Sequence, residues 1–308
     1  PTPEDTMPAL PRRRRLGRVF WLLFLLPLLL LGGSGWWLTA TPTGFATLWQ
    51  WAGQLSGGQL KVGRVQGTLW QGFTLQRLHW QTPDSQLVLS QLVLDWDAQA
   101  LWQRQLHIRS LQLGPVSWRS RPDPQPKPLQ APSDLSLPLT LRVDTLRVAS
   151  LSLPDSQLQL GPLQASYRYD SGRHQLQLTQ LDTPWGRLQS EVALGDAAPF
   201  ALHGSSRFQG DIDGLATRGQ LAYSGSLLFP QLRGDVSAKG LLLALQGKLA
   251  PFDVTPLRRL RQLDLRVGGV NPQALQPHWP QASLALALQL TPQNADTIQG
   301  GISVVNNQ

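Results

Sequence analysis

The sequence predicts a mainly β protein: a transmembrane helix and a short amphipathic helix precede a long, curled, antiparallel-type β-sheet with an apolar inner face. Three observations predict this class. An uncharged apolar stretch stands near the N-terminus. After residue 58, short apolar alternations bounded by Gly, Pro, Asp and Ser replace helical periodicity. Several alternations change phase by one residue at the same place in the pattern, which indicates strands that bend. We call this change of phase a skip.

Composition excludes several classes of protein. The 308 residues include 12 Trp and no Cys, which excludes disulfides, zinc–thiolate sites and thiol nucleophiles. The formal net charge is +8, but the 22 basic and 17 acidic residues after residue 40 are scattered. A nucleic-acid groove needs clustered Lys and Arg with interleaved aromatic residues. Because no later segment has such a cluster, no nucleic-acid partner is expected.

Residues 19–39 are predicted to form a transmembrane helix. The run VFWLLFLLPLLLLGGSGWWL carries no charge, and at about 1.5 Å per residue it spans the roughly 30 Å hydrocarbon core. Pro27 is a defect that membrane helices tolerate, and Trp residues are typical of membrane interfaces. The residues assigned to the membrane anchor are Val19, Trp21, Pro27, Trp36 and Trp37.

The basic tail, residues 1–18, predicts the orientation of this helix. By the positive-inside rule the tail stays in the cytoplasm, so the bulk of the chain is expected in the periplasm, on the other side of the inner membrane. The residues that set this topology are Arg12, Arg13, Arg14 and Arg15. The alternative is a signal peptide cleaved after Ala40. That site fits poorly, because Leu38 stands where the cleavage rule needs a small residue.

A short amphipathic helix is predicted at residues 43–56. Apolar residues recur at helical spacing, Thr43 is a candidate N-cap, and Gly57 and Gly58 end the pattern. Two interpretations fit equally well. The helix lies near the membrane surface, or it covers the apolar end of the adjacent sheet.

Residues 59–308 are predicted to form the β region. A Pro-rich stretch at residues 120–138 interrupts it, and its polar composition is typical of a surface loop or linker between two groups of strands. The strands themselves are mostly alternations of Leu with Gln, Ser, Arg and Thr. They therefore have one apolar and one wettable face.

The stretch Leu87-x-Leu89-x-x-Leu92-x-Leu94 changes phase at Ser90–Gln91. The same form recurs in residues 106–113, 141–153, 158–163 and 176–181. In a flat strand this skip would turn the second apolar set to the opposite face. A β-bulge or a sharp strand corner keeps both sets on one side and bends the strand. The sheet is therefore expected to curl toward its apolar side.

Two interpretations of the apolar interior remain open. A face lined mostly by unbranched Leu suits a guest with many conformations, such as acyl chains. Alternatively, a second sheet covers it in a β-sandwich with a dry core, which the periodicity alone fits equally well.

The order of several motifs carries a family resemblance. Gly67 to Phe73 forms a Gly-x-Leu-x-x-Gly-Phe-type strand, Leu92 to Trp96 ends a strand before a Leu-rich turn, and Leu106 to Leu111 follows as a Leu-x-Ile-x-x-Leu strand. Residues 62–118 thereby resemble the beginning of TamB-type proteins of the AsmA-like superfamily. Residues 263–291 are similar to inter-strand segments of that family. The resemblance covers most of residues 18–308.

The resemblance implies a bridge-like lipid carrier. Such proteins have an inner-membrane anchor and a half-pipe sheet through which phospholipids move toward the outer membrane. They pair with an Omp85-class outer-membrane barrel, TamA, and are also linked to outer-membrane protein assembly. Family members are longer and end in a C-terminal domain that contacts the barrel. That domain is missing here, so the chain is expected to be an N-terminal fragment.

The resemblance and the apolar phase together predict the residues that contact lipid. These residues are apolar positions on both sides of the phase skips, expected on one face of the curled sheet: Phe73, Leu75, Leu78, Trp80, Leu87, Leu89, Leu92, Leu94, Leu106, Ile108, Leu111 and Leu113. A different function uses the same sheet. A periplasmic scaffold or binding module would assist barrel assembly through its edge strand without carrying lipid.

No catalytic site, metal site or cofactor is expected. The sequence has no His-Glu-x-x-His, Gly-x-Ser-x-Gly, P-loop or Gly-x-Gly-x-x-Gly motif, and its five His are dispersed, so an enzyme is not predicted. Asp95, Asp97 and the segment 210–214 offer oxygens for calcium, but Asp at turns commonly bonds its own backbone. A carbohydrate platform would need an exposed row of Trp on one outer face. The candidates are Trp80, Trp96, Trp102 and Trp118.

Overall fold

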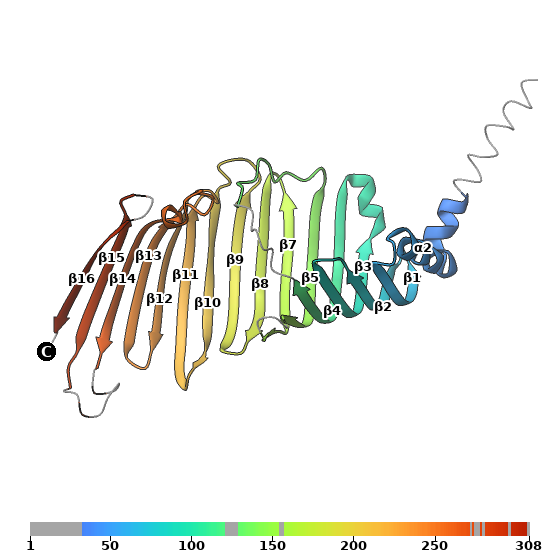
Figure 1. Cartoon of the computed structure of the whole chain (residues 1–308). Coiled ribbons are helices and arrows are strands. Elements are labelled where there is room, and N and C mark those ends of the chain that lie inside the picture. The colour runs from blue at the N-terminus through green and yellow to red at the C-terminus, as the bar shows by residue number, and fades with distance from the viewer. Residues whose placement is uncertain are drawn as a thin grey trace, which may run out of the picture.

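The strands form one open, curled sheet that does not close on itself (Figure 1). The computed structural model describes residues 33–120, 129–153, 157–271, 273, 278, 281–294 and 297–306. Within these ranges all strands belong to one 16-stranded sheet. The predicted mainly β class with a long curled sheet is confirmed. The alternative of a sandwich with two facing sheets does not hold for the described residues.

The strands follow one another across the sheet in chain order, with the short β6 beside β5. Their bounds are β1 Leu60–Thr68, β2 Gly72–Gln81, β3 Ser85–Asp97, β4 Gln105–Ser120, β5 Thr140–Leu153, β6 Leu158–Leu160, β7 Leu163–Asp170, β8 Arg173–Thr183, β9 Gly186–Gly195, β10 Leu202–Ile212, β11 Leu215–Gly225, β12 Pro230–Ala238, β13 Leu241–Leu249, β14 Leu260–Val270, β15 Leu284–Pro292 and β16 Ile298–Asn306. Two 3₁₀ turns, η1 at Ala98–Gln103 and η3 at Pro256–Arg259, join strands.

Strands β4 and β5 are parallel, whereas every other described pair is antiparallel. The prediction of an antiparallel-type sheet is wrong at this one pair. Parallel neighbours need a connection of about a dozen residues or more, because the chain must return to the starting end. The predicted Pro-rich loop is that connection. Its described part, residues 129–139, has no helix or strand.

A helix, α2 at Pro42–Leu55, precedes the sheet in the segment where the sequence predicts residues 43–56. The N-cap is Thr41 rather than Thr43: the Thr41 hydroxyl accepts a hydrogen bond from the Gly44 amide at 3.0 Å. Pro42 follows as the first helical residue, a position where its missing amide costs nothing.

The predicted transmembrane helix lies mostly outside the described residues. Among its anchor residues, Val19, Trp21 and Pro27 lie outside, as do the topology residues Arg12–Arg15. Residues 33–40, which include Trp36 and Trp37, are helical. Within the described ranges, no helix combines the length and apolar character needed to cross a membrane.

The phase skips form a line across the first five strands. Ser90–Gln91 of β3 lies opposite Gln76–Arg77 of β2, and the β2–β3 register does not shift there. Both strands therefore skip together, which makes a shared corner rather than a two-against-one bulge. Arg77 adopts a left-handed conformation at this corner, with φ of 54°. Similar skips align at Gly63–Arg64, Gly114–Pro115 and Ala149–Ser150.

Farther along the sheet the skips are resolved in two other ways. In β8, the two residues Thr179–Gln180 lie opposite a single residue on each neighbouring strand, Gln164 of β7 and Gln189 of β9. The register therefore shifts and a β-bulge results. At residues 158–163 the predicted bent strand is two strands, β6 and β7. Pro162 between them has no amide to donate, and Gly161 has φ of 120°, a conformation that favours glycine.

Candidate functional site: the apolar face of the sheet

The register places apolar side chains in rows that cross the sheet. Residues opposite one another on paired strands lie on the same face. One row can be followed from β2 to β16: Leu75, Leu92, Leu113, Val148, Leu163, Leu181, Leu188, Phe208, Gly219, Val236, Leu243, Val267, Leu286 and Val304. With strands spaced about 4.8 Å apart, this row is about 60 Å long.

The residues predicted to contact lipid all lie on this face. Phe73, Leu94 and Leu111 are opposite one another in β2, β3 and β4. The next rows contain Leu75, Leu92 and Leu113, then Leu78 and Leu89, then Trp80 and Leu87. Leu106 and Ile108 extend the face into β5, where they are opposite Leu141 and Val143.

The set of residues predicted from the sequence did not include all of the apolar face. Val62 and Val65 extend it to β1, opposite Leu78 and Leu75, and Val116 of β4 lies opposite Leu89. The signal was present, because each of these strands has its own alternation. The alternation does not specify the register between strands, and the register decides whether the apolar residues of neighbouring strands share a face.

Most of the apolar face has no covering layer. Among the described residues other than Gly and Pro, only nine hydrophobic residues are buried: Phe45, Leu75, Leu89, Trp96, Ala98, Ala165, Tyr169, Phe200 and Ala250. Most other residues in the rows are half-buried, and Leu176, in the middle of the sheet, is 41% exposed. A dry core would bury these side chains. The face is therefore a wide apolar surface open to a guest.

The corner makes the apolar surface locally deeper. Leu75 and Leu89 flank the corner and are 1% and 5% exposed, whereas Ser90 and Gln91 at the corner are exposed. The sheet therefore bends toward its apolar side there. A guest on this part of the face would contact the neighbours of Leu75 and Leu89 rather than these two side chains.

Helix α2 covers the β1 end of the apolar face. Phe45 is buried, and its ring centroid lies 5.1 Å from that of Phe73. Trp49 packs beside both rings, with centroids 6.3 and 6.4 Å away. Figure 1 shows α2 at this end of the sheet, with β16 at the opposite end. Of the two interpretations of this helix, these contacts support the one in which it covers the sheet end.

Polar groups interrupt the face in β9 to β11. Ser190 and Ser206 lie opposite one another in a row that also contains Leu178 and Leu221. The Ser206 hydroxyl donates to that of Ser190 at 2.8 Å, and the Tyr223 hydroxyl also bonds Ser206. These hydroxyls satisfy one another, as buried polar groups require.

The connection before β5 crosses to the same face. The Leu135 amide donates to the Asp196 carbonyl at 3.0 Å, and the Leu135 carbonyl lies 3.0 Å from His174 Nε2. His174 and Tyr169 are opposite one another in an apolar row, with ring centroids 4.5 Å apart. Tyr169 donates to the Asp196 carboxylate at 2.8 Å. The connection therefore covers one end of this row.

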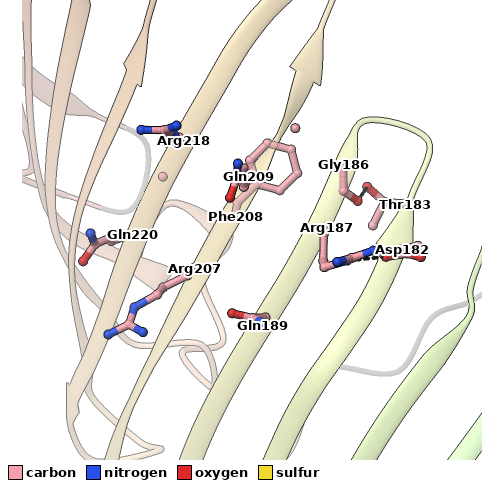
Figure 2. A pocket seen from close by; sticks show the side chains of 12 residues that line it. Asp182, Thr183, Gly186, Arg187, Gln189, Arg207, Phe208, Gln209, Arg218 and Gln220 are labelled. Atoms are coloured by element: carbon pink, nitrogen blue, oxygen red, sulfur yellow. Dashed lines mark hydrogen bonds and ion pairs between the residues drawn. The ribbon is translucent and has the colours of Figure 1, made fainter.

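The polar face has a different chemistry, seen in a hollow of about 750 Å³ (Figure 2). Arg187, Arg207 and Arg218 alternate there with Gln side chains on β9, β10 and β11. Arg187 Nε donates to Asp182 at 2.9 Å, which holds the pKa of the Asp182 carboxyl below its usual value. The hollow is wide and its guanidinium groups are exposed, so it does not enclose a small molecule.

The other sequence candidates have structural roles. Asp97 accepts from the Gln99 amide at 2.9 Å, and Asp211 accepts from the Gly214 amide at 2.7 Å, so both cap turns. Trp80 and Trp118 flank Leu87 on the apolar face, while Trp96 is buried and donates to the Leu69 carbonyl at 2.6 Å. These Trp residues do not form a row on the polar face, so the carbohydrate platform has no support.

Comparison with protein families identifies the chain. The family model described as TamB, N-terminal domain, matches residues 30–199, which is more than half of the sequence. The chain belongs to the TamB family. The match spans α2 and strands β1 to β9 of this TamB-family sheet, and it confirms the resemblance found in the sequence. No curated protein and no solved structure matches the chain significantly.

Proposed function

We propose that this TamB-family chain conducts phospholipids toward the outer membrane along the apolar face of its sheet. The observation that carries the proposal is the continuous apolar row from Leu75 to Val304, which the described residues leave largely uncovered. Acyl chains laid on this face would gain about 0.8 kcal/mol for each methylene removed from water. The head group would remain in water, because the sheet does not close.

The chemistry of the face suits movement rather than storage. Successive strands present nearly the same Leu-rich surface, so the binding free energy of a lipid changes little from one strand to the next and no single site traps it. No step of this process requires a catalytic residue, a metal or a cofactor, and we propose that the protein is not an enzyme.

We place the protein in the inner membrane by a single N-terminal span, with its N-terminus in the cytoplasm and its sheet in the periplasm. The proposed partner at the outer membrane is an Omp85-class barrel of the TamA type. The support for both is family membership and the uncharged run that begins at Val19.

One observation favours a second candidate function, a scaffold for barrel assembly. Among the described residues, β16 pairs with β15 alone, and its nine residues are all exposed, including Ile302 and Val304. Unprotected edges are templates for added strands. In this role the protein would offer β16 to a partner and carry no lipid.

Photo-crosslinking tests the proposal against this alternative. Leu94 lies on the apolar face opposite Phe73 and Leu111, whereas its neighbour Val93 lies on the other face opposite Thr74 and Gln112. A photoreactive residue at position 94 of the membrane-anchored protein is expected to form phospholipid adducts, and one at position 93 is not.

Leu176 and its neighbour Gln177 make a second matched pair near the middle of the sheet. Only intramolecular protein adducts at positions 94 and 176 would defeat the conduit. Adducts between β16 and a barrel protein, without lipid adducts at position 94, would establish the scaffold instead.

A further inference from the structure

Five large side chains at the β1 end of the sheet have no place in the groove. Trp36, Trp37, Trp51, Leu55 and Trp70 are between 39% and 88% exposed. They come from the helical residues 33–40, from α2 and from the turn between β1 and β2. We call these five residues the aromatic collar. Large exposed apolar side chains that border one strand of a sheet indicate an interaction site.

The collar is fixed to the sheet. Trp70 Nε1 donates to the Thr39 hydroxyl at 3.0 Å, and the Leu69 amide donates to the Thr39 carbonyl at 3.0 Å. The rings of Trp36 and Trp70 lie 6.0 Å apart. Through these contacts the helical residues 33–40 hold the β1–β2 turn in place. A surface that engages the collar therefore also positions the first rows of the apolar face.

The charges around the collar select the kind of partner. No Asp or Glu occurs between Thr6 and Pro83, although the chain has 19 acidic residues in all. Lys61 and Arg64, on the edge strand β1, are exposed. A segment that has no acidic residue and exposes cations and Trp residues complements an anionic phospholipid surface. A symmetric contact with a second copy would bring the same cations together, which is unfavourable.

We propose that the aromatic collar lies in the interfacial zone of a phospholipid bilayer and seats the β1 end of the sheet there. The uncharged run from Val19 leads directly into residues 33–40, so the collar begins where that run ends. The exposed indoles occupy the head-group level, and Lys61 and Arg64 contact anionic head groups. Lipids would then enter the apolar rows from this leaflet. Only the entry of lipids rests on the proposed function; the position of the collar at the bilayer does not.

The test uses the absence of cysteine from the chain. Leu55→Cys and Trp70→Cys each receive a fluorophore, and the full-length protein is reconstituted in phosphatidylcholine–phosphatidylglycerol vesicles whose lipids carry a nitroxide near the head group. The matched control is Val254→Cys between β13 and η3, because Val254 is 82% exposed, Leu55 is 88% exposed, and β13 lies far from β1 in the sheet. We expect at least three-fold stronger nitroxide quenching at positions 55 and 70 than at position 254.

Two results would overturn the proposal. One is equal quenching at positions 55, 70 and 254. The other is shielding of position 55 that increases with protein concentration but not with nitroxide lipid, which would assign the collar to a second copy. Circular dichroism spectra confirm that each variant keeps its β-sheet. Lipid adducts at Leu94 report carriage separately, so seating and carriage can fail independently.

Discussion

Leucine residues in equivalent places of the sequence pattern have very different environments. Leu75 is 1% exposed and Leu176 is 41% exposed, yet both belong to apolar rows. Leu75 lies beside the corner, where the bend brings neighbouring rows together. Leu176 lies where no second layer faces the sheet. At the scale of single residues, burial therefore depends on the bend and the layers, not on the residue type.

Asp144 gives a pH-dependent prediction at this scale. Its carboxylate lies 2.7 Å from His107 Nε2 and accepts from Arg142 Nε at 2.6 Å. The hydrogen bond with His107 and the Arg142 guanidinium hold the pKa of Asp144 below its usual value. A carboxyl whose pKa is lowered by folding stabilises the protein above its unfolded pKa of about 3.9, and this is lost as pH falls through the folded pKa.

Asp144→Asn should therefore lower the melting temperature by about 1–3 °C at pH 7, the range for a partly exposed ion pair. The difference from the wild type should shrink as the pH falls below about 4. Calorimetric melts between pH 7 and pH 3 measure it. Asp235→Asn, at an exposed carboxylate on β12, is the control and should show little difference at any pH. A difference that stays constant down to pH 3 would contradict the assignment.

At the scale of elements, the parallel pair β4–β5 depends on the length of its connection. From Gln105 to Ser120, β4 extends for about 50 Å. The chain from Ser120 to Thr140 reaches about 66–72 Å when fully extended. The same connection must also bring Leu135 within hydrogen-bonding distance of the Asp196 carbonyl. Its proline content favours the extended form that this path requires.

Deleting residues 121–128 should separate β4 from β5, because the remaining chain reaches only about 40–43 Å. The measurement is a disulfide between Gln112→Cys and Arg147→Cys, which are opposite one another in the pair. It should form in the otherwise unchanged chain and be lost in the deletion variant. Replacing the same residues with Gly and Ser keeps the length and should retain it. Full crosslinking in the deletion variant would show that length is not limiting.

At the scale of the whole molecule, the uncovered apolar face gives a prediction about transport. Leu92 and Leu94 lie in adjacent positions of the apolar rows, opposite Leu75 and Phe73. Replacing both with Arg places two charges on the proposed path of the acyl chains, where desolvating the charges is costly. Delivery of phospholipid to the outer membrane should fall at least ten-fold, while the protein remains in the inner membrane.

The matched control replaces two residues outside the apolar rows. Gln91 and Gln112 are exposed, so Gln91→Arg with Gln112→Arg adds the same charge without entering the apolar rows. Transport of phospholipid by this variant should be close to wild type. Equal loss in both double variants would point to instability or net charge rather than to a blocked path.

The sequence by itself determined the mainly β class, the position of α2 to within one residue and the existence of the skips. These features are local: alternation, capping residues and turn residues act over a few positions. It also placed the lipid-contact candidates on one face, because each skip was interpreted as a bend that keeps both apolar sets on the same side. The expected strand from Gly67 to Phe73 was wrong, because residues 69–71 form the turn between β1 and β2. Residues 19–32 of the predicted membrane helix lie outside the described part, so that prediction stays open.

The tertiary structure alone decided how the strands combine. The pattern at residues 158–163 could not reveal two strands, and the Pro-rich stretch could not reveal that β4 and β5 are parallel. Only the register showed that skips in β1 to β5 align into a corner, and only the single layer showed that the apolar face is uncovered. Register and layering depend on contacts between residues far apart in the chain, which no local pattern specifies.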